Sequence, residues 1–212
     1  FNPVRYMGLL EIVIEQTNDK DKINLLKNFC ESKLGKGVIK CGDTPGFLGN
    51  RIGVYAMQIA MTEAIKMNLS IEEADAVFGR PMGIPKTGVF ALYDLIGIDL
   101  MSDVLKSFIK ELPESDKFHL VAKEIPLVNK LIQTGYTGRK GKGGFYRMKK
   151  VGEKKVFEAI NLETGNYSPS KKIDIKSDKV DLKKLINRND KYGDYAWIVL
   201  SKIIKYASSL VP

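Results

Sequence analysis

The segment 41–68 constrains the fold of this chain most strongly. It reads CGDTPGFLGNR followed by IGVYAMQIAMTEAIKMN, and its second half is apolar on nearly every helical face. A helix that is apolar all round must be buried, so other elements have to pack around it. Thr44 can cap this helix and Pro45 suits its first turn, because proline lacks an N–H that would find no partner there. The sequence therefore predicts one long central helix.

Two residue types near the start of this helix need an explanation. Gly46 carries no side chain, so another backbone or a ligand can approach the helix there. Asn50 and Arg51 should lie one turn inside the helix, where polar groups are costly unless they find partners. Pairing with the backbone or the surface would explain both residues, whereas a bound ligand would make Asn50 a site residue.

The composition is typical of a globular protein. Of the 212 residues, 44% are hydrophobic and 28% are charged, and no apolar run is long enough to span a membrane. Lys and Arg outnumber Asp and Glu by 34 to 25, which favours an anionic partner, although a lysine-rich solvated surface explains the charge equally well. Cys30 and Cys41 have no metal or redox spacing, so we expect a reduced, cytoplasmic setting.

The N-terminal residues are patterned as a strand, a helix and a strand. Residues 8–15 are rich in Leu, Ile and Val, and Glu11, which interrupts them, could simply face water. Asp19 can cap a helix over 20–34 that carries its apolar residues on one face, and 38–41 predicts a second strand. A βαβ unit of this kind belongs to a larger parallel sheet, so we expect a further domain upstream of this sequence.

The next hundred residues predict a helical layer. Ser70 begins a capping box with Glu73, and a short helix should follow it. Further helices are expected over 90–108, with a break near Gly97, and over 116–134, irregular at Pro126. The segment 136–146 is basic and glycine-rich, but it lacks GxGxxG, so we reject it as a dinucleotide fingerprint.

The C-terminal part alternates between strand, linker and helix patterns. Residues 145–167 predict strands joined by turns, 168–190 a polar linker, and 192–210 an apolar helix. GVYA at 53–56 and GDYA at 193–196 form a weak repeat. We therefore expect a second helical unit to begin here and to be poorly anchored.

Four stretches together resemble the C-terminal part of the NAD-dependent 3-hydroxyacyl-CoA dehydrogenases: FNPVRYMGLLEIV, CGDTPGFLGNR, GRPMGIPKTGVFALYDLIGIDL and GRKGKGGFY. The resemblance covers about residues 1–146. It implies a mainly α fold, a helical domain like the C-terminal domain of 6-phosphogluconate dehydrogenase, preceded by a βαβ remnant of a Rossmann domain. GIPKTGVF looks like the long members that are fused to an enoyl-CoA hydratase. The implied parts are 1–42 (remnant of the NAD-binding domain), 43–148 (helical domain), 149–190 (hairpin and linker) and 191–212 (second helical repeat).

The resemblance also implies a function. The family oxidises 3-hydroxyacyl-CoA to 3-oxoacyl-CoA with NAD in fatty-acid β-oxidation, and its catalytic histidine would lie two positions before Phe1. Glu11 matches the glutamate that orients this histidine, Asn50 the active-site asparagine, and Lys140 a lysine that reaches the cofactor. The implied partners are an acyl-CoA substrate, the missing Rossmann domain and a second copy in a homodimer or pseudo-dimer. His119 matches no family position, and we expect it at the surface or at the start of a helix.

Other interpretations remain open at this stage. A non-catalytic dimerisation or scaffold module could keep the same helical fold. A nucleic-acid binder would need basic residues grouped on one face with stacking aromatics, whereas the aromatic residues here fall mostly in apolar helix patterns. No metal site is expected, and this fragment alone should be inactive, because the histidine and the NAD fingerprint lie upstream of it.

Overall fold

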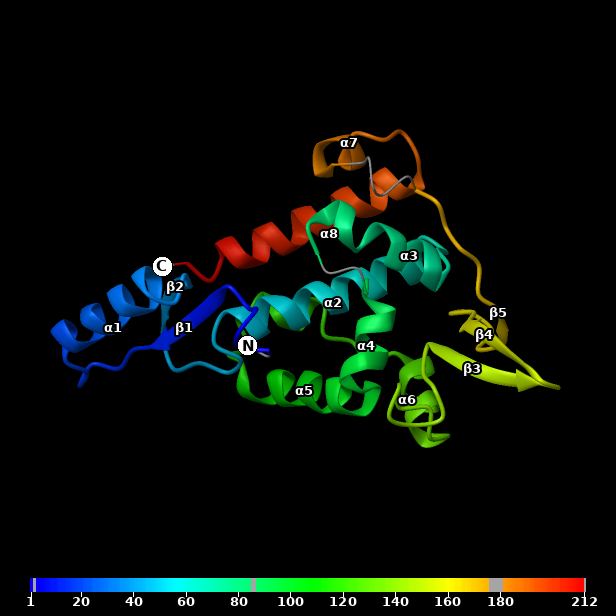
Figure 1. Ribbon diagram of the computed structural model, residues 1–212, viewed down its shortest axis with the longest axis horizontal. Helices are drawn as coiled ribbons and strands as arrows, with labels where there is room; N and C mark the ends of the chain where they lie inside the picture. Colours follow the sequence, from blue (N-terminus) through cyan, green and yellow to red (C-terminus); the bar gives the residue numbers. More distant parts are fainter. Residues whose placement is uncertain (2, 85–86, 176–180, 212) are drawn as a thin grey trace. The chain divides into compact units, whose positions relative to one another are not determined.

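Two structural units make up the chain, Phe1–Gly53 and Val54–Pro212 (Figure 1). The computed structural model describes residues 1, 3–84, 87–175 and 181–211. Helices predominate in it, as predicted. None of the helices within the described ranges is long and apolar enough to cross a membrane.

The first unit is the predicted βαβ arrangement. Strands β1 (Leu9–Val13) and β2 (Gly37–Cys41) are parallel and in register, and helix α1 (Lys20–Ser32) connects them. Asp19 caps α1 by accepting from the N–H groups of the helix's first turn, as its position predicted. Cys30 is the buried residue of α1, whereas Leu26 and Phe29 are exposed, and so is Leu34 just beyond it, so most of the predicted apolar face lies open within this unit.

The start of the long helix differs from the prediction. Helix α2 spans Gly49–Lys66, and a turn occupies residues 45–48, so Thr44 is not its cap. The Phe47 N–H donates to the Thr44 carbonyl in this turn. Asn50 consequently lies in the first helical turn and is exposed, not one turn inside. The buried character of the rest of α2 is confirmed, because residues 54–61 are all buried.

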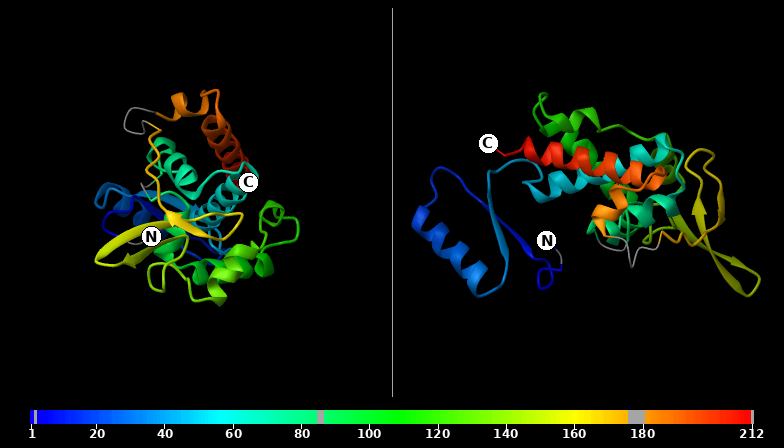
Figure 2. Two further views of the ribbon diagram at one scale, coloured as in Figure 1. Left: turned by 90° about the vertical axis from the view of Figure 1, so that its right-hand side faces the viewer. Right: turned by 90° about the horizontal axis from the view of Figure 1, so that it is seen from above.

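The second unit packs its helices around the buried part of α2 (Figures 1 and 2). The capping box at Ser70 is present, and the break near Gly97 is confirmed. Gly97 permits this break because it adopts a φ of 117°. The helices of this layer are α3 (Ile71–Val77), η1 (Arg80–Met82), α4 (Phe90–Ile96), α5 (Ile98–Glu111), η2 (Lys117–Leu120) and α6 (Pro126–Gln133).

The segment 116–134 does not form the single helix that its pattern suggested. It contains the short 3₁₀ helix η2 and the separate helix α6, whose first residue is Pro126. The ring of Pro126 keeps Ile125 extended, with φ −104° and ψ 118°, and an extended residue cannot continue a helix. Proline therefore starts a helix here instead of distorting one.

A small antiparallel sheet follows the helical layer. Strands β3 (Tyr146–Val151) and β4 (Lys154–Ile160) form the predicted hairpin, in which Tyr146 lies opposite Ala159, and β5 (Tyr167–Pro169) adds a third strand. Residues 176–180 of the expected linker lie outside the described residues. Helix α7 (Leu182–Ile186) occupies part of the linker that was expected to be irregular.

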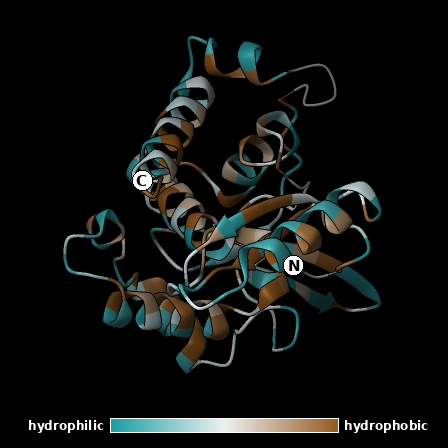
Figure 3. Cartoon of the chain, turned by 90° about the vertical axis from the view of Figure 1, so that its left-hand side faces the viewer, coloured by the Kyte–Doolittle hydropathy of each residue, from teal (hydrophilic) through white to brown (hydrophobic). Residues whose placement is uncertain are grey.

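The last helix corrects a prediction. Helix α8 (Lys191–Ser208) packs along α2, and Figure 3 shows hydrophobic and hydrophilic residues alternating around it. The Tyr195 hydroxyl donates to the Ala60 carbonyl at 2.8 Å, and the Tyr206 ring stacks on Tyr55 at 4.0 Å. The expectation of poor anchoring is wrong, because α2 itself supplies the apolar partners of α8. Whether 191–212 begins a second repeat stays a prediction.

Candidate functional site

Glu11 lies in the middle of β1 and is bound to the start of α2. Its Oε1 accepts the N–H of Leu48 at 3.0 Å and the N–H of Gly49 at 2.6 Å. The first N–H groups of a helix have no partner within the helix, and the helix dipole favours a negative charge beside them. Glu11 therefore satisfies two backbone donors, which pattern analysis of the strand alone did not predict.

An unusual turn directs these two amides at Glu11. Gly46 and Phe47 both adopt the left-handed conformation, with φ of 73° and 49°. This conformation is strained for phenylalanine by about 1–2 kcal/mol, so the surrounding structure has to hold it. A Cβ at Gly49 would lie 2.5 Å from Cζ of Phe1, so a larger residue at the start of the helix would require the Phe1 ring to move.

Asn50 follows the second of these amides directly. It is exposed, so its side chain is not needed to satisfy the interior of the helix. The structure therefore brings Glu11 and Asn50 to the same helix start, one held through the backbone and the other free to face a ligand. The roles that the resemblance implies, an orienting carboxylate at Glu11 and an active-site amide at Asn50, stay predictions.

A cavity of about 190 Å³ lies beside Glu11 in the first unit. Phe1 and Phe47 contribute to its apolar walls. Lys36 also lines it and donates from Nζ to the carbonyls of Val4 at 2.7 Å and Met7 at 2.6 Å, which fastens the segment before β1. The cavity thus combines one carboxylate with apolar walls, a setting in which a neighbouring imidazole or small polar group could be oriented.

The cysteines offer no nucleophile to this site. Burial and the negative charge of Glu11 raise the pKa of the Cys41 thiol, which keeps it protonated near neutral pH. Cys30 is buried, and both cysteines are free. Within the described ranges, no three His, Cys, Asp or Glu side chains are grouped closely enough to hold a metal ion.

Lys140 belongs to the second unit, at the exposed tip of the loop before β3. Asp94, at the end of α4, fixes both sides of this loop. Its carboxylate accepts the N–H groups of Phe145 at 2.8 Å and Tyr146 at 2.7 Å, and its carbonyl accepts the N–H of Arg139 at 2.8 Å. The Lys140 ammonium is therefore presented from a loop that is held rigidly at its base.

The glycines of this loop allow the backbone to pack closely against Asp94. A Cβ at Gly144 would collide with Oδ1 of Asp94, and a Cβ at Gly138 would lie 2.5 Å from the Asp94 carbonyl oxygen. These contacts explain a glycine-rich sequence that has no phosphate-binding strand–helix context. Sequence reasoning missed Asp94, because the partners of its carboxylate lie about fifty residues further along the chain.

Asp75 on α3 is a second carboxylate that the sequence did not single out. It accepts the N–H groups of Phe90 at 2.7 Å and Ala91 at 3.0 Å and the Tyr146 hydroxyl at 3.0 Å. Burial raises its pKa to about 7 and that of Asp94 to about 6, against the opposing effect of these donors. The sequence held one signal of such a carboxylate. Val89, the N-cap residue of α4, has no side-chain acceptor, so the first N–H groups of α4 need an acceptor from elsewhere in the chain.

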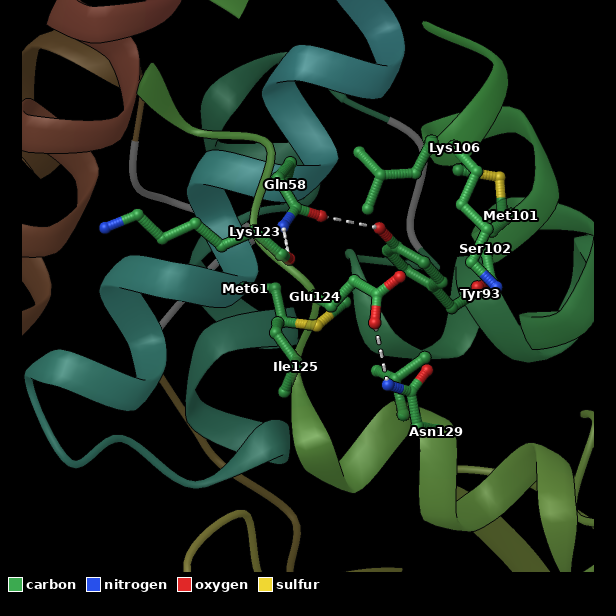
Figure 4. Close-up of a pocket in the computed structure, with 12 residues that line it drawn as sticks. Gln58, Met61, Tyr93, Met101, Ser102, Lys106, Lys123, Glu124, Ile125 and Asn129 are labelled. Carbon is green, nitrogen blue, oxygen red and sulfur yellow. Dashed lines mark hydrogen bonds between the residues drawn. The ribbon is translucent and has the colours of Figure 1, made fainter. Parts of the chain in front are cut away.

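Figure 4 shows a further cavity, between α2, α4, α5 and α6. Its polar centre is the buried amide of Gln58, which donates to the Lys123 carbonyl at 2.7 Å and accepts from the Tyr93 hydroxyl at 3.5 Å. The cavity measures about 20 Å³, which holds one water molecule but no substrate. His119 is far from Gln58 in the sequence and lies on η2. It is partly exposed, and its Nε2 is 3.0 Å from the Pro113 carbonyl oxygen.

Comparison with known proteins identifies the relatives of this chain. Residues 46–148 match the family described as 3-hydroxyacyl-CoA dehydrogenase, C-terminal domain. The chain is 40% identical, over its whole length, to a putative fatty acid oxidation complex trifunctional enzyme of Rickettsia prowazekii (strain Madrid E), of which it covers 29%. It is 31% identical, again over its whole length, to a probable 3-hydroxyacyl-CoA dehydrogenase of Bacillus subtilis (strain 168), of which it covers 27%.

A solved structure agrees with these matches. The crystal structure of M. tuberculosis FadB2 superimposes with a TM-score of 0.56 and 26% identity, covering 69% of this chain and 50% of that protein. The chain thus spans less than a third of the length of the two relatives above and half of the solved one.

Proposed function

Because the chain belongs to the 3-hydroxyacyl-CoA dehydrogenase family, whose C-terminal domain it carries at residues 46–148, we propose that it serves in a longer enzyme that oxidises 3-hydroxyacyl-CoA to 3-oxoacyl-CoA with NAD. The chain covers less than a third of the length of the two relatives above, which supports its place in a longer enzyme. The setting of this activity is fatty-acid oxidation, in the cytoplasm.

One observation carries the proposal. The Glu11 carboxylate is held by the two amides that open α2, and Asn50 is the next residue of the same helix. The strand and the helix thereby fix the spacing between a charged group and a neutral amide. A dehydrogenase needs such a pair, one to support a general base and one to donate to the oxygen that becomes a ketone.

The chemistry assigns a different role to each group. Hydride leaves C3 of the substrate only as the hydroxyl proton is removed, and a histidine suits this removal near neutral pH. We place that histidine two positions before Phe1, whose ring lines the same cavity as Glu11. Glu11 would fix the tautomer of the histidine and stabilise its protonated form, while Asn50 would donate to the developing ketone or position the thioester.

Lys140 fits a part in cofactor binding. It is an exposed cation on a loop that Asp94 holds in place, which suits it to one phosphate of NAD. NAD would supply the hydride acceptor when bound, and its main site would lie in the Rossmann domain that the βαβ unit would complete. The exposed Trp197 and Ile204 on α8 support pairing with a second helical copy.

The test replaces Glu11 by Gln in the full-length enzyme. Glutamine keeps an oxygen for the Leu48 and Gly49 amides, so the fold should persist while the charge is lost. We expect kcat to fall by about 10²-fold or more, and the acid limb of its pH profile to shift. Glu15→Gln is the matched control, because Glu15 is exposed just beyond β1. Unchanged kinetics in Glu11→Gln would contradict the assigned role.

A further inference from the structure

A groove of about 660 Å³ crosses the second unit, and none of the residues discussed so far as catalytic lines it. It runs between α3, the start of α4, the β3–β4 hairpin and the segment after β5. A second hollow of about 470 Å³ adjoins it. The two depressions share the residues Ala91, Arg139, Tyr146 and Phe157. Their size is that of a site for a small molecule.

Positive charge dominates the walls of this groove. Arg80, Arg139, Lys171 and Lys172 all line it and are exposed. Among the described residues of this unit, the ion pairs involve other cations, such as Lys66 and Lys202 with Glu63, and Lys191 with Glu73. The Arg139 charge also acts on the Asp94 carboxylate, but all four groove cations are exposed to an anion from outside the chain, and two of them are the guanidinium groups best suited to phosphate.

The acidic residues of the groove already have partners. Asp75 accepts two backbone N–H groups and the Tyr146 hydroxyl, and Glu72 accepts the N–H of Lys171 at 3.0 Å. Burial favours the neutral form of Asp75. The four cations outnumber these two acids, so the groove shows net positive charge to solvent.

Two aromatic residues, Tyr146 and Phe157, also line the groove. Phe157 stacks in parallel on Tyr146, with 5.3 Å between the ring centroids and 3° between the planes. Half of Phe157 is exposed, while Tyr146 is fixed from behind by Asp75 and Asp94. An exposed ring on a rigid support is a surface on which a planar base can stack.

We propose that this groove binds the adenosine phosphate end of a ligand, with the base on Phe157 and the phosphates between Arg80, Arg139, Lys171 and Lys172. The inference rests on the proposed function, because acyl-CoA and NAD both end in adenosine that carries phosphate groups. Either source satisfies the same chemistry. The proposal adds a binding site on the helical unit that does not include Glu11, Asn50 or Lys140.

The test measures binding to the purified chain by calorimetry, without turnover. The probes are adenosine 3′,5′-bisphosphate for the coenzyme A end, NAD, and inorganic pyrophosphate. We expect saturable 1:1 binding of at least one adenosine probe. Lys171→Gln/Lys172→Gln should weaken it at least tenfold, whereas Lys149→Gln/Lys150→Gln, which removes equal charge from exposed positions outside the groove, should not.

Phe157→Ala separates a nucleotide site from a simple anion site. It should weaken the adenosine probe and leave pyrophosphate binding unchanged. The proposal is overturned if the wild-type chain binds no adenosine probe, if both lysine pairs weaken binding equally, or if Phe157→Ala has no effect. Because these readouts do not involve catalysis, they can fail while the Glu11→Gln result in the full-length enzyme still supports the dehydrogenase assignment.

Discussion

Three carboxylates in this chain bind backbone N–H groups at places that a sequence pattern cannot reveal. Glu11 binds the start of α2, Asp75 the start of α4, and Asp94 the residues that enter β3. In each case the partner lies between fifteen and fifty-two residues away along the chain. The resemblance to a family pointed to Glu11, whereas Asp75 and Asp94 emerged only from the structure.

Asp75 predicts how stability depends on pH. Its pKa is about 7 in the folded chain, against 3.8 ordinarily, so the folded state holds a proton that the unfolded state has released between pH 4 and 7. Stability therefore falls as pH rises through this range, by an amount on the order of 2 kcal/mol between pH 5 and pH 8. Urea unfolding at both pH values measures it.

Asp75→Asn should remove most of this dependence, and the remainder belongs to Asp94, whose pKa of about 6 acts in the same direction. Asp103→Asn is the control, because Asp103 is exposed on α5. If the wild type and Asp75→Asn lost stability equally between pH 5 and pH 8, the folded pKa of Asp75 would not be raised.

At the scale of elements, the sequence predicted those helices, strands and turns that depend on local interactions. The βαβ order, the capping box at Ser70, the break at Gly97 and the hairpin follow from capping, glycine and alternation. The predicted start of α2 was wrong because the left-handed conformation of Phe47 depends on tertiary contacts, which the local sequence DTPGF does not reveal. Helix α8 was misjudged for the same reason, since its partner α2 lies far away in the sequence.

The packing of α8 predicts a contrast between two aromatic residues of one helix. Tyr206 is 1% exposed, stacks on Tyr55 and donates to Asp116, so Tyr206→Ala should cost about 3–5 kcal/mol of unfolding free energy. Trp197 is 56% exposed, and Trp197→Ala should cost about 0.5 kcal/mol. Denaturant titration of both variants compares them. Equal losses would mean that α8 does not pack on α2 as described.

At the scale of the whole molecule, the site residues divide between the two units. Glu11 and Asn50 belong to the first, and Lys140 and the proposed nucleotide groove to the second. The assignment of Glu11, Asn50 and Lys140 came from the resemblance, whereas the groove emerged only from the structure. Composition was less informative, because a net charge of +9 fits phosphate-bearing ligands and a lysine-rich surface equally well.

This division predicts that the 212-residue chain has no dehydrogenase activity by itself. The proposed general base and the main NAD site both lie in the part of the enzyme expected upstream. The assay mixes the purified chain with NAD and 3-hydroxybutyryl-CoA and follows NADH absorbance, with the full-length enzyme as the positive control. Turnover by the chain at a rate near that of the full-length enzyme would contradict the need for the upstream histidine.

The central claim is that Asn50 acts on the reacting acyl group. It stands in the first turn of α2, exposed, next to the amides that hold Glu11, so its side chain contributes little to the fold. Losing a hydrogen bond to a developing charge costs about 2.7–4 kcal/mol, or about 10²- to 10³-fold in turnover. Losing an exposed side chain changes stability by about 0.5 kcal/mol, which shifts the melting temperature by about 2 °C or less.

The most direct measurement is therefore the turnover of full-length Asn50→Ala together with the melting temperature of the same variant. We predict a fall in kcat of about 10²- to 10³-fold, with the melting temperature nearly unchanged and NAD still bound. A variant that turns over at the wild-type rate while folded would contradict the account, and if it also melted earlier, Asn50 would be a structural residue of the helix start.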